Sequence, residues 1–171
     1  MSKHLNPFRL NVGFIAHQSI GYHRDFDFEF AQIHLPPDLD LQNLGGVASV
    51  SRTSEGLLVQ VKISTSVQAC CVRCLDDYIQ PLEVDFTELY TFASHAQPST
   101  ELIYPENGQV DLGPLIREYL TLEIPISPIC KTDCKGLCPV CGENLNFTQC
   151  DHEPETVDPR FSALQSLLDD E

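Results

Sequence analysis

Apolar and polar residues alternate along much of the first two thirds of the chain, as they do in strands with one buried face. The clearest run places Phe26, Phe28 and Phe30 between acidic residues, and we expect its acidic side to face solvent. Further strands are predicted at 8–14, 47–51, 57–67 and 82–86, with a loop rich in Pro, Asp and Gly at 36–46. One-sided alternation is typical of antiparallel sheets.

The alternation stops after residue 93, and Pro98 and Pro105 mark a long surface loop at 94–107. Apolar residues then recur at intervals of three and four, which predicts a helix whose stripe packs on the sheet: Leu112, Leu115, Ile116, Tyr119 and Leu120. Asp111 is the expected N-cap, and Pro125 ends this helix. A second, short amphipathic helix is predicted at 158–168.

These elements predict an α+β fold. We expect an antiparallel β-rich sheet or partly open barrel with one packed helix, a Cys-rich metal-binding segment and a short C-terminal helix. The core and its helix occupy residues 1–126, and the Cys-rich segment with the terminal helix occupies 127–171, together as one integrated domain. A chain of 171 residues is long enough to bury a core without disulfides.

The net charge of the chain indicates which kinds of macromolecule it can bind. There are 25 acidic and 10 basic residues, which gives a formal charge of −15. Non-specific binding to nucleic acid relies on Lys and Arg, so a basic protein partner is the better match. Excess acid also aids solubility. No apolar run is long enough for a membrane span and no signal peptide is apparent, so we expect a cytoplasmic protein without a membrane partner.

Eight cysteines in a reducing compartment indicate metal or redox chemistry more than disulfides. The strongest motif is Cys138-Pro-Val-Cys141-Gly142, in which both sulfurs can turn to one side. We predict a structural zinc site, with iron as the other ion that soft sulfur ligands admit. The candidate ligands are Cys130, Cys134, Cys138, Cys141 and Cys150. His152 is a further possible ligand, although an exposed loop histidine is the expected interpretation.

A second motif, Cys71-Val-Arg-Cys74, lies between two predicted strands and therefore near a hairpin tip. Three interpretations stay open: plain structural thiols, a zinc site shared with Cys138 and Cys141, or a redox pair. The redox pair lacks the βαβ context of thioredoxin-like sites. Cys70 alternates to the other face and is expected to be a small buried apolar residue.

Common catalytic motifs are missing from the sequence. There is no GxGxxG, GxxxxGK[ST], HExxH or GxSxG, and the acidic residues fall on predicted strand faces and the chain end. We therefore expect no enzymatic activity and no small-molecule substrate.

Several motifs occur in a fixed order along the chain and together resemble one family. They are Cys71-Val-Arg-Cys74-Leu75, the 111–125 helix ending in Leu-Glu-Ile-Pro, Cys134-Lys-Gly-Leu-Cys-Pro-Val-Cys-Gly142, Glu143-Asn-Leu-Asn146, Cys150 and Asp158-Pro-Arg-Phe161. The sequence is similar to the YceD-like family, known as the large ribosomal RNA subunit accumulation protein, over about residues 8–168. In that family a cysteine typically occupies the place of His152, and some members lack the Cys-rich segment.

The resemblance implies a bacterial or organellar protein that supports the accumulation of 23S ribosomal RNA. Because the chain is so acidic, we favour an indirect role through a basic ribosomal protein or assembly factor. A local patch with Arg73, Lys131 and Lys135 that touches large-subunit rRNA is the alternative mechanism. The alternative functions are a zinc-stabilised protein-interaction module without a ribosomal role and a thiol-redox protein using Cys71 and Cys74.

Overall fold

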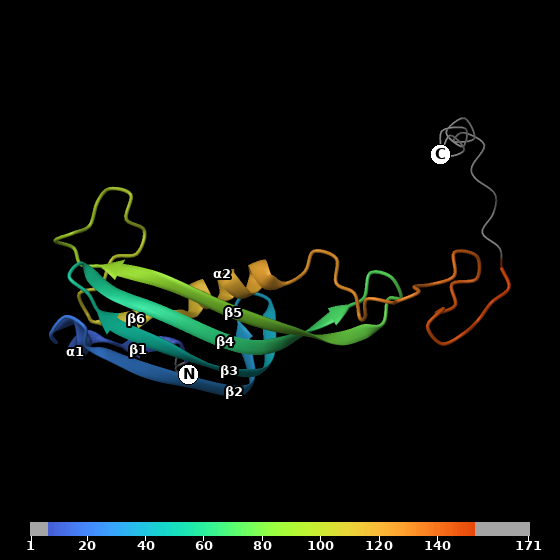
Figure 1. The fold of residues 1–171 in the computed structure, drawn as a ribbon, viewed down its shortest axis with the longest axis horizontal. Helices are drawn as coiled ribbons and strands as arrows, with labels where there is room; N and C mark the ends of the chain where they lie inside the picture. Colours follow the sequence, from blue (N-terminus) through green and yellow to red (C-terminus); the bar gives the residue numbers. More distant parts are fainter. Residues whose placement is uncertain (1–6, 153–171) are drawn as a thin grey trace.

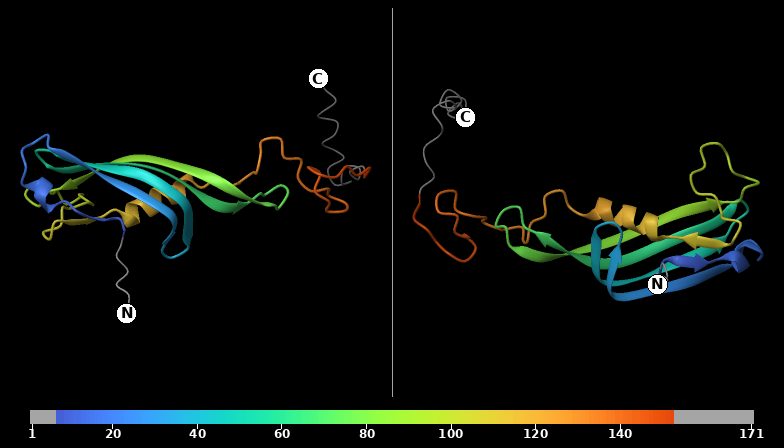
Figure 2. Two further views of the ribbon diagram at one scale, coloured as in Figure 1. Left: turned by 90° about the horizontal axis from the view of Figure 1, so that it is seen from below. Right: turned by 180° about the vertical axis from the view of Figure 1, so that it is seen from behind.

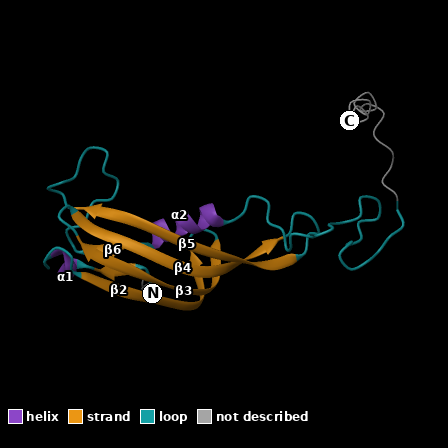
Figure 3. Cartoon of the chain, viewed as in Figure 1, coloured by secondary structure: helices purple, strands orange, loops and turns teal. Residues whose placement is uncertain are grey.

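The computed structural model describes residues 7–152, so the helix predicted at 158–168 lies outside the described residues. Within that range the chain forms six strands and two helices (Figures 1 and 3). In chain order they are β1 (Arg9–Asn11), α1 (Gly13–Ala16), β2 (His23–Leu35), β3 (Leu39–Arg52), β4 (Gly56–Cys70), β5 (Asp77–Thr91), β6 (Gln109–Asp111) and α2 (Gly113–Glu123).

The main sheet is antiparallel and open, and its four strands follow one another in chain order from β2 to β5. Strands β1 and β6 form a separate antiparallel pair. This pair and α2 lie on one side of the main sheet, which leaves the other side of that sheet uncovered by them (Figure 2). The predicted antiparallel β-rich α+β class is confirmed, as an open sheet rather than a closed barrel.

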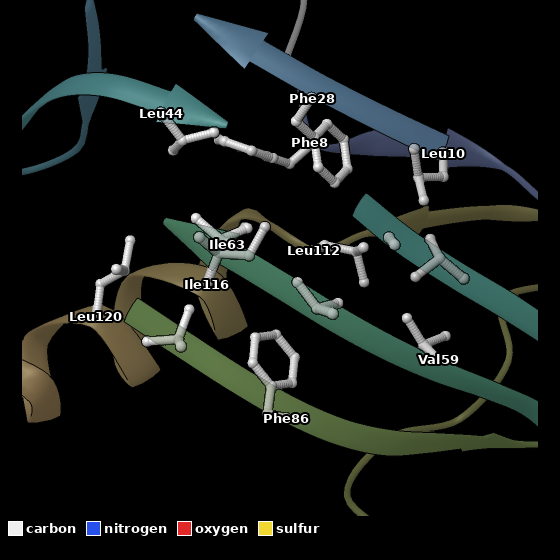
Figure 4. Packing of buried hydrophobic residues seen from close by; sticks show 14 of the residues in the cluster. Phe8, Leu10, Phe28, Leu44, Val59, Ile63, Phe86, Leu112, Ile116 and Leu120 are labelled. Carbon is white, nitrogen blue, oxygen red and sulfur yellow. The ribbon is translucent and has the colours of Figure 1, made fainter. Parts of the chain in front are cut away.

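The core lies between the inner side of the sheet and α2. The alternating side chains of β4 that point inward are buried, and α2 contributes the fully buried Ile116 and Leu120 (Figure 4). Phe86 of β5 stacks on Tyr119 of α2 with ring centroids 4.2 Å apart. The N-cap of α2 is Leu112, so the expected N-cap at Asp111 is wrong by one residue. The Asp111 carboxylate, one residue earlier, still accepts a hydrogen bond from the Gly113 N–H at 2.9 Å and so satisfies one donor of the helix start.

The strand predicted at 82–86 is longer than expected, as β5, and two other predicted segments are wrong in kind. The run at 8–14 is not one strand, because β1 pairs only with the three residues of β6 and the chain then turns into α1. The Asn11 side chain accepts a hydrogen bond from the Gly13 N–H at 3.3 Å at this turn, and Phe14 is left 39% exposed.

The expected loop at 36–46 is also wrong. The turn between β2 and β3 occupies only residues 36–38, and β3 already begins at Leu39. A register shift between Gln42 and Gly45, where Asn43 has a φ of 51°, interrupts the pairing of β3 with β4 but not the strand itself. The longer strand β3 is stabilised by the buried side chains of Leu39, Leu41 and Leu44, which pack in the core. The Gly and Asp residues around them make this segment resemble a loop in the sequence. The predicted loop at 94–107 is confirmed, apart from a single bridge between Thr91 and Ile103.

The hairpin of β4 and β5 is longer than the rest of the sheet. Strand β3 pairs with β4 only as far as Gln42 opposite Ser66, whereas β4 and β5 stay paired to Cys70 opposite Asp77. The tip of this hairpin therefore extends beyond the sheet and meets the chain segment that follows α2 (Figure 1). The register places Cys71 and Cys74 in the tip, as predicted.

Candidate metal centres

The first cluster consists of Cys71 and Cys74 from the hairpin tip and Cys130 and Cys134 from the segment after α2. Their four sulfur atoms all lie within 4.8 Å of one another. The Cys71 and Cys134 sulfurs are 3.9 Å apart, and those of Cys74 and Cys130 are 3.7 Å apart. Three of the four residues are buried, and Cys130 is half-buried.

Local backbone geometry turns the tip sulfurs inward. The Leu75 N–H donates to the Cys71 carbonyl at 2.9 Å, and Leu75 has a φ of 61°, so the chain reverses within one tight turn. The Cys71 N–H donates to the Asp76 carbonyl at 2.9 Å and closes the same turn. Residues 71–76, called the tip turn from here on, thus present two cysteines to one point.

The segment after α2 is held against the tip turn by direct hydrogen bonds. The Val72 N–H donates to the Pro128 carbonyl at 2.9 Å. The Arg73 guanidinium donates to the Cys134 carbonyl at 3.1 Å. These contacts bring cysteines separated by more than fifty residues to one place.

The electrostatics of the first cluster distinguish its thiols. Burial of Cys71 opposes ionisation, but hydrogen bonds from the backbone N–H groups of Cys130 and Cys74 outweigh burial and lower the pKa of Cys71 to about 6. A hydrogen bond from the Asp76 backbone favours the Cys74 thiolate, but burial and the neighbouring thiols outweigh it and raise the pKa of Cys74 to about 12. Several thiolates at one point repel one another, and a cation at their centre would remove that penalty.

The second cluster consists of Cys138, Cys141, Cys150 and His152, and its ligand atoms also lie within 4.8 Å of one another. Gly142 has a φ of 76°, and its N–H donates to the Cys138 carbonyl at 2.9 Å. This turn is the one that the Cys-Pro-Val-Cys-Gly motif predicts, because glycine adopts a positive φ without strain. The Cys138 sulfur lies 3.9 Å from His152 Nδ1.

Backbone donors also select one thiol of the second cluster for ionisation. The backbone N–H groups of Cys141 and Val140 hydrogen-bond to Cys138 and lower the pKa of this thiol to about 6. Hydrogen bonding to Cys138 and burial raise the pKa of Cys150 to about 11. The second cluster thus shows the same pattern as the first, with a stabilised thiolate beside a thiol that resists ionisation.

Both donor sets suit a tetrahedral soft cation. With metal–sulfur bonds of about 2.3 Å, sulfurs at the corners of a tetrahedron lie about 3.8 Å apart. The two sulfur–sulfur distances of the first cluster, 3.9 and 3.7 Å, match this value. A disulfide would hold its sulfurs at about 2.0 Å, and all eight cysteines are free. Four sulfurs, or three sulfurs and an imidazole, are the donor sets of closed structural zinc sites.

The structure does not bring the predicted ligands to one site. Cys130 and Cys134 join the first cluster, whereas Cys138, Cys141 and Cys150 join the second. One interpretation of the sequence places Cys71 and Cys74 in a zinc site shared with Cys138 and Cys141. The structure does not bring these two pairs together. The tip cysteines instead lie with Cys130 and Cys134. His152 is exposed in a loop, as expected, but its ring also lies beside the three cysteines of the second cluster.

One signal in the sequence could have revealed this division. Seven cysteines and His152 together make two sets of four, and each set contains one Cys-x2-Cys pair. Cys70 is the cysteine left over. Its expected burial is wrong, because its side chain is exposed and its sulfur lies 3.3 Å from the Leu75 carbonyl oxygen.

In the part of the chain that the structure describes, no helix is both long and apolar enough to cross a membrane. Comparison with solved structures gives no match. Comparison with curated proteins does give relatives. "Uncharacterized protein Rv2926c" of Mycobacterium tuberculosis is 34% identical over 135 residues, which cover 77% of this chain and 61% of the relative. The chain thus spans less than two thirds of this relative's length.

Two other relatives extend the comparison. "Uncharacterized protein YlbN" of Bacillus subtilis is 31% identical over 113 residues, or 64% of this chain and 66% of the relative. "Large ribosomal RNA subunit accumulation protein YCED homolog 1, chloroplastic" of Arabidopsis thaliana is 41% identical over 63 residues, or 37% of this chain and 20% of the relative.

The sequence profile that matches this chain covers residues 59–168, a range that contains the β4–β5 hairpin from Val59 onward, α2 and every residue of both clusters. Its description is "Large ribosomal RNA subunit accumulation protein YceD". The match agrees with the order of motifs from Cys71 to Phe161 in the sequence. The chain therefore belongs to the family of the large ribosomal RNA subunit accumulation protein YceD.

Proposed function

We propose that this chain is a non-enzymatic factor that supports the accumulation of large-subunit ribosomal RNA by binding a basic protein in the cytoplasm. The partner is a ribosomal protein or an assembly factor, and the RNA is affected through it. Zinc is the proposed ion of the clusters, with a structural role. The observation that carries the proposal is the distribution of acidic residues on the sheet.

The outer side of the main sheet concentrates negative charge. The alternation in the sequence predicts that Asp25, Asp27 and Glu29 lie on one face of strand β2. The strand register adds acids from the opposite edge, because the row from Asp27 runs through Val47 and Lys62 to Asp85. The parallel row from Glu29 ends at Glu83 in the same way.

We call these five exposed residues the acidic sheet face: Asp25, Asp27, Glu29, Glu83 and Asp85. In the described rows that join these acids across the sheet, the one basic side chain is Lys62, which pairs with Asp85 at 3.0 Å. Strands are spaced about 4.8 Å apart, so three spacings separate the edge strands by about 14 Å. At 0.1 M salt the Debye length is about 10 Å, so the two edges are largely screened from each other. Acids two apart on one strand lie only about 7 Å apart, so the fields of the carboxylates reinforce one another within each edge.

Such a face favours a partner rich in Lys and Arg and disfavours RNA. Repulsion of like charge across an interface costs several kcal/mol, whereas complementary charge accelerates encounter. The acids alternate along β2 and β5 with the buried Phe28 and Phe86, and Phe86 stacks on α2, so the acidic sheet face points away from α2. Figure 2 shows that α2 covers only one side of the sheet. It is therefore accessible to a partner without rearrangement of the core.

The test is sedimentation of the tagged protein in lysates of a strain that lacks the chromosomal copy. The variant replaces the acidic sheet face with amides: Asp25→Asn, Asp27→Asn, Glu29→Gln, Glu83→Gln and Asp85→Asn. The expected result is loss of co-migration with precursor large subunits and lower 23S rRNA. The matched control neutralises five exposed acids elsewhere, Glu55, Glu101, Glu106, Glu118 and Glu123, and should keep both.

The competing mechanism, direct contact with RNA, has its own variant. Lys131→Ala with Lys135→Ala removes two exposed basic side chains beside the first cluster. If this variant loses rRNA association and the amide variant of the acidic sheet face keeps it, the protein-contact mechanism is wrong. The proposal expects the opposite pattern.

A further inference from the structure

We propose that the chain binds two zinc ions in centres with different functions. The first cluster forms a four-cysteine centre that fastens the segment 127–137 to the sheet. The second forms a centre of three cysteines and one histidine, with His152 as a ligand, that closes only its own loop. This inference goes beyond the proposed function and does not depend on the identity of the partner.

The fastening role follows from where the ligands of the first cluster lie. Cys71 and Cys74 belong to the hairpin of the main sheet, whereas Cys130 and Cys134 follow α2. A metal bound by all four therefore closes a long loop of the chain, which reduces the entropy of the open state.

Little other than the first cluster secures this segment. Apart from sulfur contacts, four hydrogen bonds join the described residues 127–152 to the tip turn; they link Val72 to Pro128, Arg73 to Cys134, Leu137 to Arg73 and Asn144 to Asp76. The apolar cluster at this junction is small: three buried cysteines against Tyr78, Ile129 and Cys130. It is separate from the main core. A junction with so little buried apolar area needs another source of stability, and a metal supplies one.

The second cluster differs in both topology and exposure. Its four ligands all come from residues 138–152, so a metal there closes only that short loop. The loop contacts the segment 127–137 at one end of that segment, where Asn146 accepts a hydrogen bond from the Lys135 N–H at 3.0 Å. Cys138 is buried, but Cys141 and His152 are exposed. Solvent and chelators therefore reach this centre more readily than the first, in which three ligands are buried.

His152 has the position expected of a ligand. Its Nδ1 atom lies 3.9 Å from the Cys138 sulfur, close to the separation of about 3.5 Å expected for neighbouring nitrogen and sulfur ligands of tetrahedral zinc. Cys141 and Cys150 complete the set within 4.8 Å. Without the imidazole the second cluster would have three protein ligands and an open position.

The test is native mass spectrometry of the full chain purified with zinc. The wild type should carry two zinc ions. The variant Cys71→Ser/Cys74→Ser should carry one, and so should Cys138→Ser/Cys141→Ser. Cys70→Ser is the matched control, since it removes a neighbouring exposed thiol outside both clusters, and it should keep two.

Trypsin distinguishes the functions of the two centres. Lys131 and Lys135 are exposed and lie within the segment that the first centre fastens. Loss of the first centre should accelerate cleavage after these lysines, because the backbone there is released from the tip turn. The N–H of Lys135 is hydrogen-bonded to Asn146 in the loop of the second centre, so Lys131 is the diagnostic site. Loss of the second centre should leave the rate of cleavage after Lys131 near that of the wild type.

Cobalt substitution of the wild type keeps the proposal testable if a serine variant fails to fold. Two cobalt ions should bind, and their visible spectrum should contain a four-sulfur and a three-sulfur, one-nitrogen component. His152→Cys should convert the second component to the four-sulfur type and retain two ions. One metal ion per wild-type chain, or removal of both ions by either serine pair with normal folding, would overturn the proposal.

Discussion

At the scale of single residues, the neighbouring glycines Gly45 and Gly46 of β3 have opposite surroundings. A methyl group added at Gly46 would lie within 3 Å of Ile63 and would contact the Lys62 carbonyl, both on the adjacent strand β4. A methyl group added at Gly45 would meet nothing within 4 Å. The alternation of the strand explains the difference, because Gly46 lies in a row between Phe28 and Ile63 on the inner side.

Gly46→Ala should therefore lower the free energy of unfolding by about 1–3 kcal/mol, since the inserted atom forces the strands apart. Gly45→Ala should change it by less than about 0.5 kcal/mol. Urea denaturation of the two variants checks the difference. Equal stability of both would contradict the packing described for this row.

Tyr119 makes both a hydrogen bond and a ring contact, and two substitutions can measure their contributions to stability separately. Its hydroxyl donates to Glu88 at 2.7 Å while its ring stacks on Phe86. This hydrogen bond, together with burial, raises the pKa of Tyr119. Tyr119→Phe keeps the ring and should cost about 1 kcal/mol. Tyr119→Ala also removes the half-buried ring and its stack, and should cost about 2–4 kcal/mol. Thermal unfolding of both variants measures the two contributions, and similar losses would contradict a stabilising role for the stack.

At the scale of elements, α2 is attached to the sheet through one side only. Leu120 is fully buried there, whereas Leu122 on the same helix is 77% exposed. This difference follows from the helical period, since residues two apart in a helix point in different directions.

Leu120→Ala should consequently lower the free energy of unfolding by about 2–5 kcal/mol, because it leaves a cavity beneath the helix. Leu122→Ala, its matched control, should cost less than about 0.5 kcal/mol. Chemical denaturation followed by far-UV circular dichroism checks both. A large loss in the Leu122 variant would mean that α2 packs by another face.

At the scale of the whole molecule, the sheet with α2 and the Cys-rich segment have different sources of stability. The sheet has a continuous apolar core, whereas residues 127–152 have the small apolar junction and the two clusters. Removal of metal should therefore affect the two parts unequally.

After treatment with a strong chelator, amide hydrogen exchange should accelerate in residues 127–152 and in the tip turn. Strands β3 and β4 should keep their protection, because their hydrogen bonds and core do not involve the cysteines of the two clusters. Exchange measured by mass spectrometry before and after chelation provides the comparison. Uniform loss of protection across the sheet would show that the metal supports the entire fold.

Local patterns in the sequence determined the long strands and α2, but not α1 or β6, and they determined the motifs that point to the family. The alternation around Phe26, Phe28 and Phe30 predicts a strand, and the spacing from Leu112 to Leu120 predicts α2. The turn at Gly142 is also local, because a positive φ depends on one residue. Contacts within about four residues suffice for these features.

The tertiary structure alone decided which cysteines share a cluster and how far the acidic sheet face extends. Cys71 contacts Cys134 because the β4–β5 hairpin extends beyond the other strands of the sheet. Asp85 lies in the same cross-strand row as Asp27 because of the register of three strand pairs. Both depend on the lengths and registers of strands distant in sequence. A one-residue change of register would turn Asp85 to the inner side. Ligand sets and charged faces are non-local, whereas the motifs that supply their residues are local.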